Sequence, residues 1–255
     1  MSGAGVPEYV PGHSLLAGKR VVVTAAAGTG IGFATAKRCI EEGATVLVSD
    51  AHERRLAESA AELGVPSIPC NVTDEAAVQA LVDGAVGELG GIDVLVNNAG
   101  LGGEASIVDM TDEQWGIVMD VTLNGTFRMT RAALRHMYGA GGGVIVNNAS
   151  VLGWRAQAGQ AHYAAAKAGV MALTRCAAIE AAEHGVRVNA VAPSIAMHKF
   201  LAKVTTDELL DELTSREAFG RAAEPWELAN VIVFLASDYS SYMTGEVVSV
   251  SSQHA

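Results

Sequence analysis

Tyr163 and Lys167 stand four positions apart in the run Tyr-Ala-Ala-Ala-Lys, and Ser150 precedes them. On a helix this spacing places the phenol and the ammonium on one face, with Cβ atoms about 5–6 Å apart. Opposite charges ~4 Å apart at an effective dielectric of ~20 attract by ~4 kcal/mol, and one pKa unit corresponds to ~1.4 kcal/mol. We therefore predict that the pKa of Tyr163 falls from about 10 toward about 7, which would let the phenol exchange a proton at neutral pH. The alternative is a surface Tyr–Lys pair on an alanine-rich helix.

Two segments of small residues follow short apolar runs. Ser150 closes the strand-like run 144–149, so its hydroxyl is expected at the carboxyl end of a sheet, where open α/β folds bind ligands. Residues 25–32, Ala-Ala-Ala-Gly-Thr-Gly-Ile-Gly, join another such run to a helix-like stretch. Small residues there let the backbone approach a pyrophosphate, which the N–H groups at the start of the helix can bind.

Asp50 ends the next strand-like segment, about twenty residues after this turn. A carboxylate at this position can accept hydrogen bonds from both hydroxyls of an adenosine ribose, and it would repel a 2′-phosphate. Because Ala51 supplies no cation, the sequence predicts NAD and makes NADP less favoured, although Arg54 and Arg55 keep NADP open. The alternative role of Asp50 is a cap on the following helix.

The elements that would position these residues alternate between strand and helix. Short β-branched runs bounded by small residues predict buried parallel strands. About seven are predicted, at 20–24, 45–49, 67–70, 94–97, 144–148, 186–191 and 246–250, and the helices include 31–42, 75–88, 112–137 and 163–184. This order predicts an α/β fold with a single Rossmann-type doubly wound parallel sheet and helices on both faces. We expect one dinucleotide-binding and catalytic domain over 18–255, preceded by an N-terminal extension, 1–17, that is either an ordered arm or a loose tail.

The composition argues against several classes of protein. The 255 residues carry 17 basic and 28 acidic side chains, and the formal net charge of -11 disfavours binding to nucleic acid or an anionic membrane. We find neither an apolar run long enough to span a bilayer nor a signal pattern at the start. Cys39, Cys70 and Cys176 are widely spaced and odd in number, which indicates reduced thiols in a cytoplasmic protein rather than disulfides or a metal site.

These motifs occur together in a fixed order, with residues 97–100 (Asn-Asn-Ala-Gly) and 189–193 (Asn-Ala-Val-Ala-Pro) among them. From about residue 16 to about residue 250 the sequence resembles the short-chain dehydrogenase/reductase family, most of all its 3-oxoacyl-carrier-protein reductase branch. The resemblance implies that Tyr163 is the catalytic acid/base and that Ser150 orients and polarises the substrate oxygen. It implies that Lys167 lowers the pKa of the tyrosine and binds the nicotinamide ribose.

The resemblance also implies the cofactor-binding residues and the assembly. The cofactor set is Ala26, Thr29, Gly30, Ile31, Asp50, Asn71, Val72, Asn98, Ala99, Gly100, Tyr163, Lys167, Pro193 and Ile195. A hydride would pass between the nicotinamide and the carbinol carbon of a secondary alcohol, while Tyr163 takes or returns the hydroxyl proton. A homotetramer is expected, built through the helices predicted at 112–137 and 163–184.

The sequence departs from the family pattern around the cofactor and the lysine. The glycine-rich turn holds one residue more than the pattern, so the contacts between residues 25 and 29 are open. Thr122 stands where the family has a fourth catalytic residue, an asparagine that helps hold a water linked to the lysine, and either Thr122 or Asn124 could take this role. Ser194 replaces a usual glycine, and His198 replaces a threonine that contacts the cofactor carboxamide; the role of His198 is open.

The substrate is expected to be apolar. Residues 197–213 carry a helical apolar stripe where the family has its mobile substrate-binding segment. Val151, Leu152, Trp154 and Met243 are expected near the cleft, and Arg155, Lys199 and Lys203 are either ordinary surface cations or contacts for the phosphates of coenzyme A. The leading hypothesis is a dehydrogenase that uses NAD on a lipophilic hydroxyacyl thioester or ring alcohol, or the matching ketone reductase. The alternatives are an NADPH-dependent 3-oxoacyl thioester reductase and a non-catalytic dinucleotide-binding scaffold.

Overall fold

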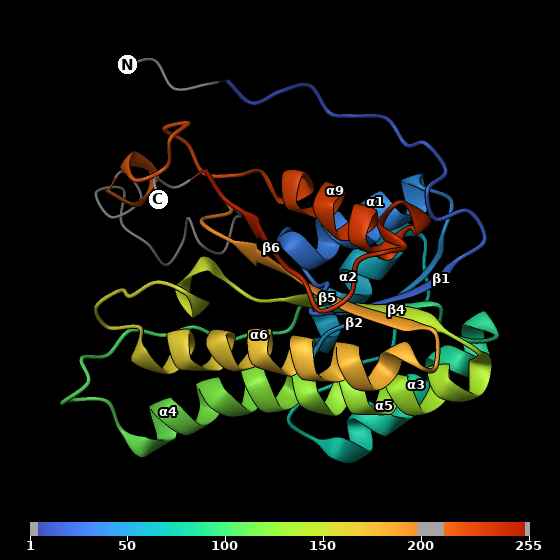
Figure 1. Ribbon diagram of the computed structural model, residues 1–255, viewed down its shortest axis with the longest axis horizontal. Helices are drawn as coiled ribbons and strands as arrows, with labels where there is room; N and C mark the ends of the chain where they lie inside the picture. Colours follow the sequence, from blue (N-terminus) through green and yellow to red (C-terminus); the bar gives the residue numbers. More distant parts are fainter. Residues whose placement is uncertain (1–4, 198–211, 253–255) are drawn as a thin grey trace.

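The computed structural model describes residues 5–197 and 212–252, and Figure 1 traces its elements. In that part of the chain six parallel strands form one sheet in the order β2-β1-β3-β4-β5-β6. The strands are β1 (Arg20–Thr24), β2 (Thr45–Ser49), β3 (Val94–Asn97), β4 (Gly143–Asn148), β5 (Val186–Pro193) and β6 (Val247–Val250). The strand order reverses between β1 and β3, and ligands of such sheets bind at the carboxyl ends of the strands beside this reversal. The predicted doubly wound α/β fold is confirmed.

The segment 67–70 accounts for the difference from the predicted seven strands. It runs beside β2 but forms a single isolated bridge, between Ser67 and Val48. Ile68 and Cys70 donate to the carbonyl oxygens of Val48 and Asp50, each at 3.1 Å, but Pro66 has no N–H group with which to continue the ladder toward the start of β2.

Helices cover both faces of the sheet, with α1 and α9 above it and α5 and α6 below it in Figure 1. The helices are α1 (Ile31–Glu41), α2 (Glu53–Leu63), α3 (Glu75–Leu89), α4 (Asp112–Met119), α5 (Gly125–Ala140), α6 (Ala161–Ala182) and α9 (Pro225–Ala236), with short 3-10 turns at Val151–Gly153 and Asp238–Ser240. Alternate residues of each strand point to opposite faces. In β1, for example, Val21 and Val23 pack toward α1, α2 and α9, whereas Val22 packs toward α3, α5 and α6. Both faces of the sheet are therefore buried, which explains its continuous apolar strands.

The helix predicted at 112–137 is interrupted. A π-helical turn, Asp120–Asn124, separates α4 from α5. A π turn carries one residue more than the same stretch of α-helix, and such turns often occur at functional sites. Thr122 lies in this turn and is fully buried.

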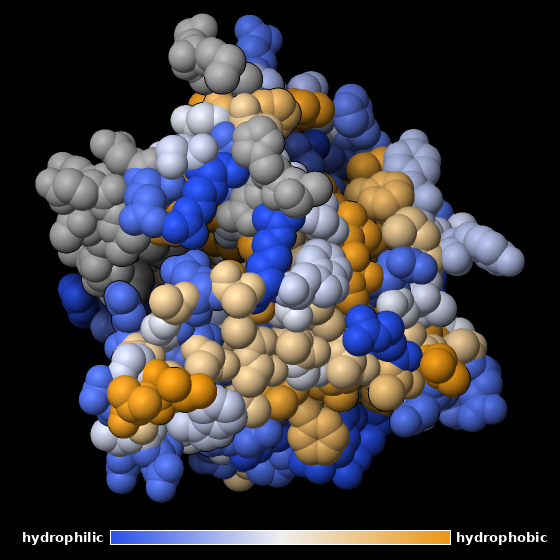
Figure 2. Space-filling model, turned by 60° about the vertical axis from the view of Figure 1, so that its left-hand side comes forward, coloured by the Kyte–Doolittle hydropathy of each residue, from blue (hydrophilic) through white to orange (hydrophobic). Residues whose placement is uncertain are grey.

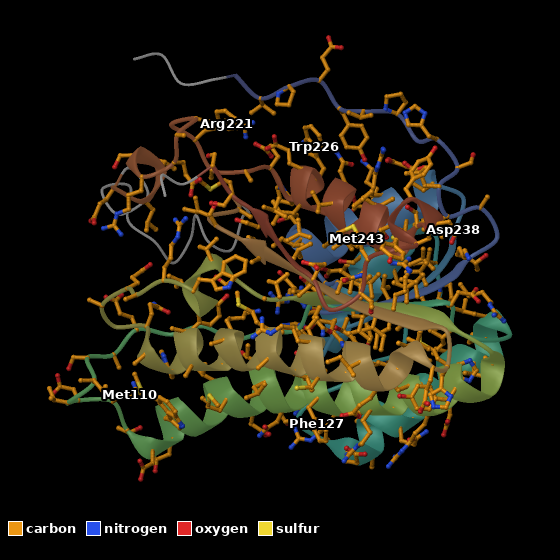
Figure 3. All side chains as sticks on the ribbon, in the orientation of Figure 1. Met110, Phe127, Arg221, Trp226, Asp238 and Met243 are labelled. Atoms are coloured by element: carbon orange, nitrogen blue, oxygen red, sulfur yellow. The ribbon has the colours of Figure 1, made fainter. Side chains whose placement is uncertain are left out.

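Residues 9–15 form an arm that lies on α1. The Tyr9 ring packs edge-on against Trp226 of α9, with centroids 5.2 Å apart, and Figure 3 shows Trp226 below the blue N-terminal trace. Arg38 donates to the carbonyl oxygen of Val10 at 2.6 Å and forms an ion pair with Glu42 at 2.8 Å. Glu42 in turn accepts from the N–H of Leu15 at 2.9 Å. A buried ion pair at the end of α1 therefore holds the arm.

Candidate active site

Ser150 is held at the carboxyl end of β4. Its backbone starts the 3-10 turn Val151–Gly153, and its Oγ accepts a hydrogen bond from the N–H of Leu152 at 3.2 Å. The side chain is buried. Its single hydroxyl hydrogen can rotate between the phenol of Tyr163 and a substrate oxygen.

Tyr163 and Lys167 lie in the first two turns of α6, which begins two residues earlier than predicted. The Nζ atom of Lys167 is 5.6 Å from the centre of the Tyr163 ring. It donates to the carbonyl oxygen of Asn148, the last residue of β4, at 2.5 Å. The structure thus brings the phenol, the ammonium and the Ser150 hydroxyl together, and the surface-pair interpretation does not hold for the buried Lys167.

The electrostatics differ from the sequence-based expectation. Burial raises the pKa of Tyr163, and hydrogen bonding with Ser150 lowers it only in part. Burial also lowers the pKa of Lys167, to about 8. The predicted fall of the tyrosine pKa toward about 7 is therefore wrong for this structure, because spacing gives the attraction between the two groups but not the cost of removing both from water.

A chain of hydrogen bonds connects the lysine to the glycine-rich turn. The Asn148 amide donates to the side chain of Asn98 at 2.8 Å, and the Asn98 amide donates to the carbonyl oxygen of Ala25 at 3.0 Å. The hydroxyl of Thr24 accepts from the N–H of Asn98 at 3.0 Å. The catalytic side of the site and the expected cofactor side are therefore one connected structure.

The turn after β1 is stretched by its extra residue. Ala25 and Gly28 have positive φ angles, of 50° and 94°. Ala26, predicted to bind the cofactor, is instead fully buried, and its N–H donates to the carbonyl oxygen of Ser49 at 3.1 Å. Its assignment is corrected, because neither its side chain nor its N–H is open to a ligand.

The start of α1 offers a better place for a diphosphate. Gly30 caps this helix without a side-chain hydrogen bond, so the N–H groups of its first turn remain available. Apart from chain neighbours, no heavy atom lies within 4 Å of the position that a Cβ would take at Gly28 or Gly30. Thr29 is exposed beside this space, and Ile31 begins the helix. These residues fit a bound dinucleotide.

Asp50 follows β2, and both of its carboxylate oxygens accept backbone N–H groups. Oδ2 accepts from Ala27 at 3.2 Å and Oδ1 from His52 at 2.9 Å. His52, rather than Asp50, caps α2, since its Nδ1 accepts from the N–H of Arg55. Arg54 forms an exposed ion pair with Glu58 at 3.3 Å.

The other predicted cofactor residues lie along the same edge of the sheet. Because all strands run parallel, the residues that follow their carboxyl ends meet there. Asn71 and Val72 follow the segment beside β2; Asn98, Ala99 and Gly100 follow β3; Pro193 ends β5, with Ile195 two residues beyond. A Cβ at Gly100 would lie 3.3 Å from the Lys167 ammonium, so this glycine brings the loop after β3 against the lysine.

Comparison with known families identifies the family to which the chain belongs. The sequence model of a family described as enoyl-(acyl carrier protein) reductase matches residues 25–252. The chain belongs to the short-chain dehydrogenase/reductase family. It is therefore an oxidoreductase that acts on hydroxyl and carbonyl groups.

Relatives of this short-chain dehydrogenase/reductase cover almost its whole length. The (5R,7aS)-5-hydroxy-7a-methyl-1-oxo-2,3,5,6,7,7a-hexahydro-1H-indene-carboxyl-CoA reductase of Mycobacterium tuberculosis is 66% identical over 255 residues, which are 97% of each chain. A 3-oxoacyl-(acyl-carrier-protein) reductase of Thermotoga maritima is 40% identical over 240 residues, covering 92% of this chain and 97% of that protein. The crystal structure of a short chain dehydrogenase from Mycobacterium smegmatis, 60% identical, matches with a TM-score of 0.89 over 98% of this chain and 99% of that one.

Thr122 stands in the family's asparagine position and lies within the site. Its hydroxyl accepts from the N–H of Leu101 at 3.0 Å and faces the carbonyl oxygen of the same residue at 3.2 Å. Its methyl group would lie 3.8 Å from a Cβ at Gly100, next to Lys167. Asn124 instead points to Asp120, to which it donates at 3.1 Å. Of the two candidates, Thr122 is the one beside the lysine.

Some residues were not found from sequence, and others lie elsewhere than expected. His162 is buried next to Tyr163, and its Nδ1 has no hydrogen-bond partner in the part of the chain that the structure describes. Nothing in the sequence distinguished Asn148 and Ser59 from ordinary polar residues.

Met243 precedes β6 and packs into the core with α9 (Figure 3), so it lies at the opposite edge of the sheet from Ser150 and not near the cleft.

The remaining expectations concern the substrate side. Seen from the side at which α6 begins, apolar surface shown in orange lies among blue polar areas (Figure 2). Leu101, Ile107, Val108 and Trp154, in the loops after β3 and β4, are large exposed apolar residues. His198, Lys199 and Lys203 lie outside the described residues. Among the helices of the described residues, none is long and apolar enough to cross a membrane.

Proposed function

We propose that this protein transfers a hydride between NAD(H) and a secondary alcohol or the matching ketone on a lipophilic substrate, either a hydroxyacyl thioester or a ring alcohol. The observation that carries this proposal is the convergence of Ser150, Tyr163 and the buried Lys167 at the carboxyl ends of β4 and its neighbours. The name of the Mycobacterium tuberculosis relative combines a ring hydroxyl with a coenzyme A ester, which supports a ring-bearing thioester here.

Each residue of the trio has a separate role in the proposal. Tyr163 takes the hydroxyl proton in oxidation and returns it in reduction. Ser150 binds the substrate oxygen, and its hydrogen bond with the phenol favours the ionised form of Tyr163. Lys167, with a pKa of about 8, is mostly protonated at neutral pH and holds the ribose next to the phenol. The nicotinamide, when bound, accepts or donates the hydride.

NAD is proposed over NADP because of Asp50. Its carboxylate is held in place by two N–H groups and still has lone pairs for the ribose hydroxyls. An NADPH-dependent 3-oxoacyl thioester reductase remains the alternative, since the Thermotoga maritima relative is a 3-oxoacyl reductase and Arg54 and Arg55 lie on the exposed start of α2.

We place the activity in one domain, residues 18–255, with residues 1–17 as an arm. The protein is proposed to act in the cytoplasm as a homotetramer and to bind neither nucleic acid nor membranes. The apolar residues exposed on the loops after β3 and β4 would contact the lipophilic part of the substrate. Arg155, in the loop before α6, is a candidate for the phosphates of coenzyme A.

The test is a steady-state assay with NAD and NADP in parallel, against acyclic hydroxyacyl thioesters and ring alcohols, with Tyr163→Phe as the control. Turnover with NAD should fall by about 10²–10⁴-fold in the variant while NAD binding is retained. Turnover with NADPH on 3-oxoacyl thioesters alone would favour the alternative. Tight dinucleotide binding without hydride transfer to or from any substrate would favour the non-catalytic scaffold.

A further inference from the structure

In the turn after β1, which holds the extra residue, two backbone N–H groups donate to side chains outside the turn. Ala27 donates to Oδ2 of Asp50 at 3.2 Å, and Gly28 donates to Oγ of Ser59 at 2.9 Å. One acceptor lies in the β2–α2 connection and the other in α2, so neither N–H group is left for a ligand. The turn and the β2–α2 connection are thus joined before any dinucleotide binds.

Ser59 is suited to this contact by its burial. It lies on the inner face of α2 with 5% of its surface exposed, and Leu56 and Ala60 of the same helix pack into the core. Neighbouring residues therefore fix the position of the Ser59 hydroxyl. Gly28 has a φ of 94°, which other residues rarely adopt, so its N–H is aimed at Ser59 by a conformation that depends on glycine.

We propose that Ser59 is a positioning residue for the adenosine half of the dinucleotide. By holding Gly28 it keeps the turn away from the space next to Gly30 and leaves the diphosphate to the first-turn N–H groups of α1. By fixing the turn it also keeps the hydrogen bond from the Ala27 N–H to Asp50. This hydrogen bond holds the carboxylate that would bind the ribose. The inference rests on the proposed function, because it takes the dinucleotide site of the family as the site in use.

A purely structural role for Ser59 would make different predictions. Loss of packing in α2 would lower stability and weaken every ligand, including one that touches only the nicotinamide side. Loss of positioning would weaken ligands that contain the adenosine diphosphate and spare the rest. The two explanations can therefore be separated by ligands that carry one half of NAD.

The first experiment is calorimetric titration of Ser59→Ala and Ser59→Thr with NAD, ADP-ribose and nicotinamide mononucleotide. Ser241→Ala is the matched control, since Ser241 is exposed before β6. The Kd of NAD and of ADP-ribose should rise by the same factor, about five- to tenfold, in Ser59→Ala. Ser59→Thr keeps an acceptor and should stay within about twofold of the wild type. An unchanged Kd for ADP-ribose, or an equal loss for nicotinamide mononucleotide, would overturn the proposal.

A second experiment needs no variant and covers the case in which Ser59→Ala does not fold. Hydrogen exchange of the Gly28 amide is followed in the wild-type protein with and without NAD. Protection before NAD is added, unchanged on binding, is the expected result. Protection that appears only with NAD would make Gly28 a diphosphate contact and refute the role of Ser59.

Failure of the proposed function would be visible separately. A wild-type protein that bound NADP more tightly than NAD would contradict the NAD preference. The Ser59 comparison uses ADP-ribose and Gly28 exchange, so it would still be decided. Conversely, unchanged ADP-ribose binding in Ser59→Ala would leave the NAD preference intact.

Discussion

The Lys167 ammonium donates to the carbonyl oxygen of Asn148, at 2.5 Å. This contact ties the first turns of α6 to the last residue of β4, and the Asn148 side chain continues the connection to Asn98 at 2.8 Å. A lysine fixed in this way, with its pKa lowered to about 8 by burial, keeps a charge near the phenol without direct contact with it.

The rate of alcohol oxidation should rise steadily with pH. Burial raises the pKa of Tyr163, so the phenolate that accepts the proton is scarce at neutral pH. Below that pKa its population increases about tenfold for each pH unit. Reduction uses the protonated phenol, which is fully populated, so its rate should be flat from about pH 6 to about pH 7, where Lys167, with its pKa of about 8, is still charged. Initial rates in both directions, measured as a function of pH, test this prediction. An oxidation profile that levels off near about pH 7 would support the Tyr163 pKa predicted from the sequence.

Ser150→Ala should move the oxidation profile to higher pH. Hydrogen bonding with Ser150 lowers the pKa of Tyr163, and its removal leaves the effect of burial unopposed. The profile is compared with that of Ser241→Ala, which should match the wild type. Below the pKa of Tyr163 a further increase lowers oxidation by the same factor at every pH but does not affect the protonated phenol used in reduction, so oxidation should lose more than reduction. Equal losses in the two directions would assign Ser150 to substrate orientation alone.

Asp50→Asn should reduce the preference for NAD over NADP. The amide oxygen can still accept one N–H, but the charge that repels a 2′-phosphate is lost. Removing a charged hydrogen-bond partner costs about 1.5–3 kcal/mol, so the ratio of kcat/KM values should change by roughly 10- to 100-fold. Parallel kinetics with both cofactors measure it, and Glu88→Gln, on the exposed side of α3, is the control. An unchanged ratio would remove Asp50 from cofactor selection.

Thr122→Val should destabilise the loop after β3. The substitution keeps the shape of the side chain but leaves the N–H and carbonyl groups of Leu101 without their hydroxyl partner. The free energy of unfolding should fall by about 1–3 kcal/mol, and kcat should fall because Gly100 in this loop packs against Lys167. Denaturant titration and steady-state kinetics provide the measurements.

Asn124→Ala is the control for this substitution. Its side chain is exposed and contacts Asp120, so a change within about 0.5 kcal/mol is expected. If Asn124→Ala reduced kcat more than Thr122→Val, the assignment of Thr122 to the lysine side of the site would be wrong.

Glu42→Gln should release the N-terminal arm in a pH-dependent way. Burial raises the pKa of Glu42, but the N–H groups of Leu15 and His13 and the Arg38 guanidinium outweigh it, so the pKa is lowered. Because the pKa is lower in the folded protein, the ionised carboxylate stabilises the fold at pH values above the pKa of the unfolded chain. This stabilisation is lost as the pH falls through the pKa of the folded protein. Breaking a buried pair costs about 3–5 kcal/mol. Denaturation near pH 7 should therefore show a large difference from the wild type that shrinks below about pH 4, whereas Glu62→Gln should show none.

The sequence predicted the strands and the position of the site residues better than it predicted the pKa of Tyr163. Runs such as 20–24 and 94–97 are β-branched and bounded by small residues, so their strands were placed with the correct bounds. Ser150, Tyr163 and Lys167 were brought together as predicted, because the ends of parallel strands and the start of the next helix share one edge. The pKa of Tyr163 was not predictable from spacing, because burial depends on loops such as that after β3.

Local interruptions also escaped prediction. Pro66 limits the pairing of an apolar segment beside β2, which forms a single isolated bridge although its residues otherwise predict a strand. The π turn at Asp120–Asn124 leaves the apolar pattern of the helix nearly unchanged, so periodicity alone could not reveal it. Ser59 gave no signal, since its role depends on a turn that is near it in space but 31 positions away.

The π turn also constrains how this chain can vary. Loss of a single codon between Asp120 and Asn124 would let α4 and α5 wind as one regular helix, which local propensity alone would tolerate. The two helices would keep nearly the same faces toward the core, because four α-helical residues cover about the same rotation as the five residues of the π turn. The bulge that carries Thr122 would be lost, and with it the hydroxyl partner of both backbone groups of Leu101. In related sequences, insertions and deletions should therefore be tolerated in surface loops and be rare in this helix.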